Sequence, residues 1–383
     1  MPRPVMLSIV GDSGSGKTTI TRGLVRVLGE DQVTHFRTDD YHRYDRRQRA
    51  EHGVTPLHPD CNYLDIMTQH LRHLRQNEPV LKPVYRHADG TFGPPVYLWP
   101  ARFVVTEGLL ANYTPPLREM FDVRVFLNPP ESVRRQWKVA RDCSQRGYSA
   151  GQVLAELDRR EPDSEAFIRP QRHHADMIVS FAPGAAAAPE RLDAHLFLRD
   201  SLPHPDLSGV VGGVAGGGAG GVAGVPDDAL ALIGHNSEQE LRISGTIAPE
   251  RALELEEAIW ERMRFASHLR QQRLGEFTVG TALHRSDTLA LTQLLILYHL
   301  VTARAVVALG GGSARAADGG VRAADGGVRA ADSGVRAADS GLSAGNGLVA
   351  APPEMPVQLP PDGRHVPGLP GRRTRRAPSP GVG

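Results

Sequence analysis

The chain has 383 residues, 40% of them hydrophobic, and a formal net charge of +1 at pH 7. This length suits one large or two ordinary domains, and the hydrophobic share is normal for a globular protein. The small net charge gives no indication of binding to nucleic acid or to a membrane surface. Two cysteines, Cys61 and Cys143, are too few for a disulfide framework and suit a reducing compartment. We therefore expect a cytoplasmic protein with neither nucleic acid nor a membrane as a partner.

The first motif lies between an expected strand and an expected helix. Residues 5–10 form an apolar run with the length of a buried strand, and residues 19–28 carry apolar side chains at helical spacing. The loop between them reads G-x-x-x-x-G-K-T, the P-loop pattern, in which backbone N–H groups surround a polyphosphate. Lys17 is expected to reach the β- and γ-phosphates of ATP, and Thr18 to bind Mg²⁺. The expected nucleotide-binding residues are Gly11, Asp12, Ser13, Gly14, Ser15, Gly16, Lys17, Thr18 and Thr19.

A pair of carboxylates follows the next expected strand, at 32–38. Asp39 and Asp40 stand at its carboxyl end, where ligands gather in a parallel α/β sheet. One of them could accept a proton from an attacking hydroxyl group, but adjacent residues point to opposite faces, and the residues alone do not decide between the two. His42 and Arg46 just beyond favour an anion-binding cluster over a plain loop cap.

Residues 47–62 are expected to form a loop, and 64–74 an amphipathic helix. An extended segment at 81–87 then carries Tyr85 and His87 at alternate positions, where they could line a polar pocket. Taken alone, a single tyrosine or histidine in a strand is more often structural.

The buried strand expected at 103–108 ends in Glu107, which is where a P-loop fold needs its second metal-organising carboxylate. Another strand is expected at 123–127, followed by a helix at 131–146 that Pro130 starts.

This helix carries a charged face. Lys138, Arg141, Asp142 and Arg146 are three, four and eight positions apart and share one side. Three cations and one carboxylate outline a clamp that could neutralise a transferring phosphoryl group. The alternative is a solvated surface with i,i+4 ion pairs, and the P-loop upstream favours the clamp.

The rest of the chain carries fewer signals. A helix is expected at 150–160, a turn at 161–163 and a strand at 177–181. Residues 209–224 are nearly all glycine, valine and alanine, which is typical of a flexible loop.

Two further helices are expected near the C-terminal end, one around Leu255 and Ile259 and one at 286–304. Polar residues interrupt the apolar segment 289–307, so we expect a buried amphipathic helix and not a membrane span. From about residue 310 the sequence Arg-Ala-Ala-Asp recurs every seven residues without an apolar seam, which indicates a disordered tail.

Several motifs together resemble the phosphoribulokinase family in its longer, cyanobacterial and plant-type form, within the phosphoribulokinase/uridine kinase group of P-loop kinases. The P-loop alone would fit many kinases. The likeness is strong over about 5–208 and weaker to about 308. The more specific matches are Asp39-Asp40-Tyr41-His42, Asp45-Arg46, Gly53-Val54-Thr55, Lys82-Pro83-Val84-Tyr85-Arg86-His87, Trp137-Lys138, Arg141-Asp142, Arg146-Gly147, Pro170-Gln171-Arg172-His173-His174-Ala175-Asp176 and Pro203-His204-Pro205-Asp206-Leu207.

The fold class that follows is α/β: a P-loop NTPase-like, mostly parallel sheet flanked by helices, with an α+β C-terminal extension and a disordered tail. The expected domains are a kinase core at 1–184 with a helical lid at about 130–160, an extension at 185–308 containing the glycine-rich loop 209–224, and a low-complexity tail at 309–383.

The resemblance implies ATP-dependent phosphorylation of D-ribulose 5-phosphate at its C1 hydroxyl, giving D-ribulose 1,5-bisphosphate and ADP, a step of the Calvin cycle. It implies that Asp39 is the general base, that Thr18 and Glu107 organise Mg²⁺, and that the protein is a homo-oligomer. The remaining catalytic residues would be Lys17, Lys138, Arg141 and Asp142, and the sugar phosphate would be bound by His42, Arg46, Tyr85, His87 and Arg146.

Two alternatives remain open: a uridine kinase-like or other small-molecule kinase of the same fold, and a regulatory ATP-binding protein. The aromatic content of 5% argues against a site that stacks on a base. Plant-type members place regulatory cysteines in the P-loop and just before the Asp-Asp pair. This chain has Ser13, Ser15 and Thr38 in those regions, so we expect no thiol switch of that kind.

Overall fold

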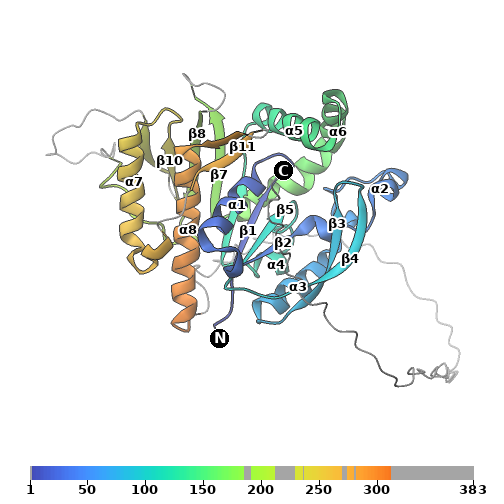
Figure 1. The fold of residues 1–383 in the computed structure, drawn as a ribbon, viewed down its shortest axis with the longest axis horizontal. Coiled ribbons are helices and arrows are strands. Elements are labelled where there is room, and N and C mark those ends of the chain that lie inside the picture. Colours follow the sequence, from blue (N-terminus) through green and yellow to red (C-terminus); the bar gives the residue numbers. More distant parts are fainter. Residues whose placement is uncertain are drawn as a thin grey trace, which may run out of the picture. The chain divides into compact units, whose positions relative to one another are not determined.

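An eight-stranded sheet runs through the described part of the chain in the order β2-β5-β1-β6-β7-β8-β10-β9 (Figure 1). The structure is a computed structural model that describes residues 2–184, 191–211, 229–235, 237–269, 274–279 and 282–311. The strands of the sheet are β1 (Val5–Gly11), β2 (Val33–Arg37), β5 (Phe103–Gly108), β6 (Val123–Leu127), β7 (Met177–Pro183), β8 (Leu192–Arg199), β9 (Leu230–His235) and β10 (Glu238–Ile243). Its first five strands are parallel and the last three are antiparallel. The expected fold class, a mostly parallel sheet flanked by helices, is confirmed.

Burial on both faces of the sheet explains the apolar sequences of the parallel strands. Strands β1, β5 and β6 are buried at every position, which their near-continuous apolar runs allow. Alternate residues of β1 enter different cores: Leu7 and Ile9 belong to one apolar cluster, and Met6 and Val10 belong to another. The sheet is therefore covered by apolar side chains on both faces.

The helices of the described residues are α1 (Lys17–Leu28), α2 (Arg46–His52), α3 (Leu64–Arg75), α4 (Pro115–Arg118), α5 (Glu131–Arg146), α6 (Ala150–Asp163), α7 (Pro249–Arg262) and α8 (Asp287–Ala308). Some of them cover the two faces of the sheet. Ile20 of α1 and Leu294 of α8 lie in the cluster with Leu7, whereas Leu71 of α3 lies in the cluster with Met6. The helices α5 and α6 pack on each other where the helical lid is expected, and we call this pair the lid although its role remains a prediction.

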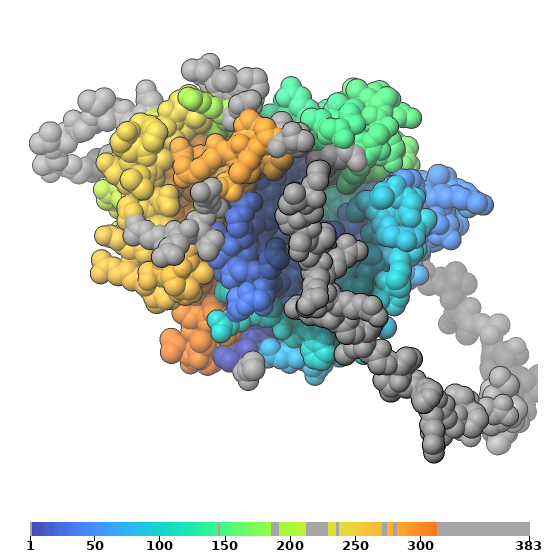
Figure 2. Space-filling model, in the orientation of Figure 1, coloured from blue at the N-terminus to red at the C-terminus, as the bar shows by residue number. Residues whose placement is uncertain are grey.

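Two small hairpins stand apart from the main sheet: β3 (Val80–Arg86) with β4 (Thr91–Leu98), and β11 (Glu276–Val279) with β12 (Ala282–Arg285). The sequence analysis anticipated the first strand, β3, and missed β4, β11 and β12. In Figures 1 and 2, which share one orientation, the lid is drawn beside α2 and the β3–β4 hairpin, and the Thr55 hydroxyl just after α2 donates to Asp163 at the end of α6 (2.6 Å).

Two expectations about local structure are wrong. Residues 47–62 do not form only a loop, because Asp45 and Gln48 make a capping box that starts α2. The turn expected at 161–163 does not form, since α6 continues through Pro162 to Asp163 and leads into a π-helical turn, Ser164–Ile168.

The C-terminal extension joins the same sheet through β8, β10 and β9. Its strand β8 was missed although every second residue is buried, among them Leu196 and Leu198. Gln293 of α8 donates a hydrogen bond to the Thr19 carbonyl (3.2 Å) and accepts one from the Gly275 N–H (2.8 Å), so α8 is fastened to the helix that follows the nucleotide loop.

Helix α8 is not amphipathic, contrary to expectation, because consecutive residues from Leu289 to Leu297 are all buried. Within the described residues, α8 is the one helix that is long and apolar enough to cross a membrane, judged by length and composition only. Inside the protein, 72% of its most apolar window is buried. This pattern is equally that of a core helix. Most of the glycine-rich loop 209–224 and all of the tail from residue 312 lie outside the described residues, and the proposed domain boundaries remain predictions.

Candidate active site

The P-loop has the backbone that its glycines allow. Gly14 and Gly16 have φ angles of 90° and 94°, in the left-handed region, and Gly16 directly precedes the first turn of α1. The Lys17 ammonium donates hydrogen bonds to the carbonyl oxygens of Gly11 and Asp12, both at 2.7 Å. Burial lowers the pKa of Lys17 to about 8, against the opposing charges of Asp39, Asp12 and Glu107. The loop therefore brings one lysine into a group of three carboxylates.

Thr18 and Glu107 meet where the metal is expected. The Thr18 hydroxyl donates to Glu107 Oε1 at 3.4 Å, and His35 Nε2 lies 3.2 Å from the same oxygen. Burial opposes ionisation of Glu107, but the contact with His35 and the charge of Lys17 hold its pKa below the ordinary value. Glu107 Oε2 is buried and has no hydrogen-bond partner in the described part of the chain.

This pair of oxygen donors fits Mg²⁺, which prefers hard oxygen ligands. Among the described residues no group of three or more His, Cys, Asp or Glu side chains could hold a metal ion. A magnesium ion bound here would thus need nucleotide phosphates and water as its further ligands, which is usual for this cation in phosphoryl-transfer sites.

Asp39 and Asp40 have different environments. Both lie on a 3₁₀ turn, Thr38–Tyr41, directly after β2. Asp40 is buried, forms an ion pair with Lys82 and accepts a hydrogen bond from the Tyr85 N–H at 2.8 Å. Asp39 has one oxygen 3.4 Å from His87 Nε2, while its Oδ1 has no hydrogen-bond partner among the described residues. Asp39 is thus the carboxylate of the pair that retains an uncommitted oxygen.

The charges around Asp39 come from several elements. Burial opposes ionisation, but His42 and His87 when protonated, and Lys17 and Arg146, hold the pKa of Asp39 below its ordinary value. An ionised carboxylate at neutral pH is the state that a proton acceptor needs.

Tyr85 is the centre of the adjoining wall. The rings of His42 and His87 lie edge-on to it, at centroid distances of 5.0 and 5.1 Å. His42 is buried and its Nδ1 lies 2.8 Å from Asn62 Oδ1, and burial lowers the pKa of His42 to about 4. His42 is therefore a neutral, hydrogen-bonding group at pH 7.

Two arginines of α2 contact the β3–β4 hairpin. Arg46 is exposed, and its guanidinium donates to the His87 carbonyl at 2.6 Å, on the turn of the hairpin. Arg49 is buried, donates to the Tyr85 hydroxyl at 2.6 Å and lies over the Tyr85 ring. The sequence analysis missed Arg49 because it took 47–62 as a loop; the Asp-x-x-Gln capping pattern was the signal that predicts a helix there.

The lid presents its four expected residues together. Asp142 is the shared partner of Lys138 (2.6 Å), Arg141 (2.8 Å) and Arg146 (3.5 Å). Burial lowers the pKa of Lys138 to about 8, although Asp142 opposes this. A Cβ added to Gly14 would lie 2.9 Å from the Lys138 Cβ, so the lid helix packs directly on the P-loop.

Both cysteines are free thiols. Cys61 is buried, and this burial raises the pKa of its thiol to about 11. A thiol with such a pKa is a poor nucleophile at neutral pH.

A P-loop between β1 and α1, carboxylates at the carboxyl ends of two neighbouring parallel strands and a cationic helix over the loop define a P-loop kinase domain. Residues 6–188 match the family model described as Phosphoribulokinase / Uridine kinase family. The resemblance to that family which the motifs predicted is confirmed over these residues.

Curated relatives carry names from both branches of the family. Phosphoribulokinase of Synechocystis sp. is 38% identical over 183 residues, which cover 48% of this chain and 55% of that protein. Chloroplastic phosphoribulokinase of Triticum aestivum is 33% identical, over 47% of this chain and 49% of that protein. Uridine kinase of Oceanobacillus iheyensis is 28% identical, over 46% of this chain and 86% of that protein.

The chain thus spans about half the length of the curated phosphoribulokinases it matches. A solved structure described as phosphoribulokinase from Rhodobacter spheroides is 16% identical, with a TM-score of 0.48, and covers 70% of this chain and 97% of that one.

Proposed function

We propose that this protein transfers the γ-phosphoryl group of ATP to the C1 hydroxyl of D-ribulose 5-phosphate, giving D-ribulose 1,5-bisphosphate and ADP. The observation that carries the proposal is Asp39, whose Oδ1 is buried without a hydrogen-bond partner among the described residues. Against the effect of burial, Lys17 of the loop and Arg146 of the lid help to hold its pKa below the ordinary value, and His87 of the hairpin lies 3.4 Å from its other oxygen. A base in this setting lies beside both the nucleotide loop and a second, cationic wall.

In the proposed reaction, Asp39 accepts the proton of the C1 hydroxyl while that oxygen forms a bond to the γ-phosphorus. The bond between this phosphorus and the β–γ bridging oxygen breaks, and ADP leaves with the electron pair. Lys17 and Lys138 neutralise charge on the transferring group, since each is a compact cation next to the loop. Mg²⁺, held through Thr18 and Glu107, supplies further charge neutralisation when it is bound.

The lid cations have a second partner available. In the structure Lys138, Arg141 and Arg146 all lie on Asp142. A bound triphosphate carries more negative charge than one carboxylate, so we expect these cations to turn toward it. Asp142 would then serve to orient them.

The acceptor wall favours a sugar phosphate. His42, Tyr85 and His87 offer hydrogen-bonding groups for hydroxyls, and Arg46, Arg49 and Arg146 are cations for a phosphate outside the P-loop. The alternative, a uridine kinase-like activity, is favoured by the share of the uridine kinase that the match covers, 86% against 55% for the Synechocystis phosphoribulokinase. We favour the sugar phosphate because these arginines provide positive charge for a phosphate group, whereas uridine is uncharged.

The test is ATP consumption by the purified full chain with Mg²⁺, with ribulose 5-phosphate, uridine and a panel of sugar phosphates as separate acceptors. Rapid turnover only with ribulose 5-phosphate supports the proposal. Turnover with uridine or another acceptor keeps the kinase chemistry and overturns the acceptor. Turnover with none, together with ATP binding, overturns the enzyme proposal in favour of a regulatory ATP-binding protein.

We also propose that the protein acts in the cytoplasm as a homo-oligomer. Light scattering coupled to gel filtration measures the oligomeric state, and a monomer at micromolar concentration contradicts it.

A further inference from the structure

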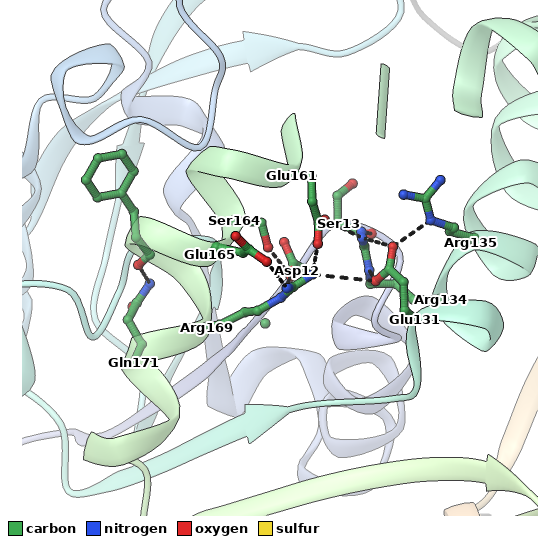
Figure 3. Close-up of polar contacts among 12 residues, drawn as sticks. Asp12, Ser13, Glu131, Arg134, Arg135, Glu161, Ser164, Glu165, Arg169 and Gln171 are labelled. Atoms are coloured by element: carbon green, nitrogen blue, oxygen red, sulfur yellow. Dashed lines mark hydrogen bonds and ion pairs between the residues drawn. The ribbon is translucent and has the colours of Figure 1, made fainter. Parts of the chain in front are cut away.

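A network of ion pairs and hydrogen bonds joins the rim of the P-loop to the base of the lid (Figure 3). Asp12 and Ser13 belong to the loop, Arg134 to the first turn of α5, and Ser164 and Arg169 to the turns after α6. The proposed roles of the loop and the lid do not use these side chains.

Arg134 fastens the lid helix to the loop backbone. Its side chain is 4% exposed, and it donates to the Ser13 carbonyl at 3.1 Å. Two more of its hydrogen bonds, at 2.7 and 2.6 Å, go to Glu131 on the same helix. A buried guanidinium with several fixed acceptors is a rigid contact, because moving it would leave a charge without partners.

Arg134 and Lys138 are one helical turn apart on α5. The same turn of the loop that Arg134 holds contains Gly14, whose added Cβ would lie 2.9 Å from the Lys138 Cβ and 3.1 Å from the Arg134 carbonyl. Arg134 and Lys138 therefore pack on the same turn of the loop.

Asp12 makes the second contact. The Ser164 hydroxyl donates to its Oδ2 at 2.6 Å, and Arg169 Nε lies 3.8 Å from the same oxygen. Arg169 also forms an ion pair with Glu161 near the end of α6. Asp12 is therefore linked to the C-terminal end of the lid, and Ser13 is linked to its N-terminal end.

A carboxylate in a phosphate-binding loop is unfavourable for binding the ligand. Asp12 is buried in a loop built to bind polyphosphate, and a negative charge there repels the ligand. Its contacts run toward Ser164 and Arg169, so the charge serves the connection to the lid.

We propose that Asp12 and Arg134 are positioning residues that hold the two ends of the lid on the nucleotide loop and so place Lys138 at the transferring phosphate. This inference rests on the proposed kinase function of the same site. The lid is anchored at its base in this arrangement, and the distal cations Arg141 and Arg146 remain free to turn toward the ligand.

The first experiment compares Arg134→Met, Arg134→Lys and the control Arg135→Met in the full chain. Arg135 is the next residue on α5 and also pairs with Glu131, but its other partner is Asp158 and not the loop. We expect Arg134→Met to lower kcat by about 100-fold, the size of effect that a misplaced catalytic group produces, with the KM for ribulose 5-phosphate within about twofold. Arg134→Lys should restore part of kcat, and Arg135→Met should keep the wild-type value.

The second experiment measures the energetic coupling between Asp12 and Lys138, and it removes no buried arginine. Asp12→Asn keeps the acceptor for Ser164 and weakens the attraction to Arg169. In the wild type this change should lower kcat, and in a Lys138→Met background it should add less than about twofold, because its effect passes through Lys138. Losses that multiply in the double variant overturn the proposal.

A third readout needs no acceptor. The chain has three tryptophans, and Trp137 lies beside the loop, since an added Cβ on Gly16 would be 3.6 Å from its ring. In a Trp99→Phe background, acrylamide quenching reports mainly Trp137, because Trp260 is 4% exposed. We expect greater quenching in Arg134→Met and Asp12→Asn than in Arg135→Met, with ATP still bound.

Equal quenching in all three variants overturns the positioning role even where activity falls. If ribulose 5-phosphate is not the acceptor, quenching and ATP affinity still report on the network. The failure of the proposed function and the failure of this inference are therefore separate results.

Discussion

Asp40 and Lys82 form a buried ion pair that joins the turn after β2 to the first strand of the β3–β4 hairpin. The other oxygen of Asp40 accepts the Tyr85 N–H at 2.8 Å, so one carboxylate holds the strand that carries Tyr85 and leads to His87. Lys82 is one of three lysines in the chain, and its ammonium is buried with Asp40.

Removing one partner of this pair should be costly. We expect Lys82→Met to lower the free energy of unfolding by about 3–5 kcal/mol, because it leaves the charge of Asp40 buried and unpaired. Asp40→Asn combined with Lys82→Met should recover much of that loss. Urea unfolding followed by circular dichroism measures both, and a loss below about 1 kcal/mol for Lys82→Met would contradict the assignment.

Asp39 should behave differently from its neighbour. We expect Asp39→Asn to lower kcat by about 10²- to 10⁴-fold and to keep ATP affinity and stability, because it removes the base and not the phosphate loop. Asp40→Asn is the matched comparison and should instead lower the melting temperature. Steady-state kinetics, nucleotide titration and thermal unfolding separate the two, and near-normal turnover of Asp39→Asn would remove Asp39 from the role.

Arg49 and Tyr85 should act as one unit. Their 2.6 Å hydrogen bond and the cation over the ring make Tyr85 depend on Arg49 for its orientation. Arg49→Met and Tyr85→Phe should each raise the KM for the sugar phosphate, and the double variant should be little worse than either. Independent, multiplying effects in a double-mutant cycle would show that Arg49 acts on the acceptor without Tyr85.

The rate should fall on the alkaline side. Lys17 and Lys138 both have a pKa lowered to about 8 by burial, so each loses its positive charge as the pH rises through that value. We expect kcat/KM, which reports the free enzyme, to fall above about pH 8. The alkaline decrease of kcat should occur at a higher pH than that of kcat/KM, because bound phosphate stabilises the ammonium forms of the two lysines. A kcat/KM that stays flat to pH 10 would contradict these pKa values.

His204 and His299 should make the protein acid-sensitive. Their rings are hydrogen-bonded at 3.0 Å, His204 also bonds the Arg199 carbonyl, and burial lowers the pKa of His299 to about 3 and that of His204 in the same direction. The folded state thus binds fewer protons than the unfolded state below the ordinary histidine pKa of 6.5, so stability is retained above it and lost as the pH falls from about 6.5 toward 3.

His299 kept neutral should lower the free energy of unfolding by about 1.4 kcal/mol per pH unit in that window, and His204 adds to the loss in the same direction. Urea midpoints at pH 7.5 and 5 measure this loss, and His299→Gln should make it smaller. A wild-type midpoint that does not move between these pH values would show that the histidines are protonated in the fold.

The nucleotide loop, its flanking strand and helix, and the charged face of α5 could be read from the chain. Each depends on neighbours within a few residues, and the glycines and apolar spacing that form them are local. The lid residues Lys138, Arg141, Asp142 and Arg146 share one side as expected, because helical periodicity alone fixes that geometry.

The contacts between distant segments came from the folded chain. Asp39 and Asp40 are adjacent and chemically identical, and they differ because Lys82, 42 residues further on, pairs with one of them. The contact of Arg49 with Tyr85 has the same cause, since its partner lies on a hairpin that packs against α2. The link between Asp12 and Ser164 spans 152 residues. Local pattern carries no information about such pairs, because their energy comes from burial and charge pairing that exist only once the sheet has brought the segments together.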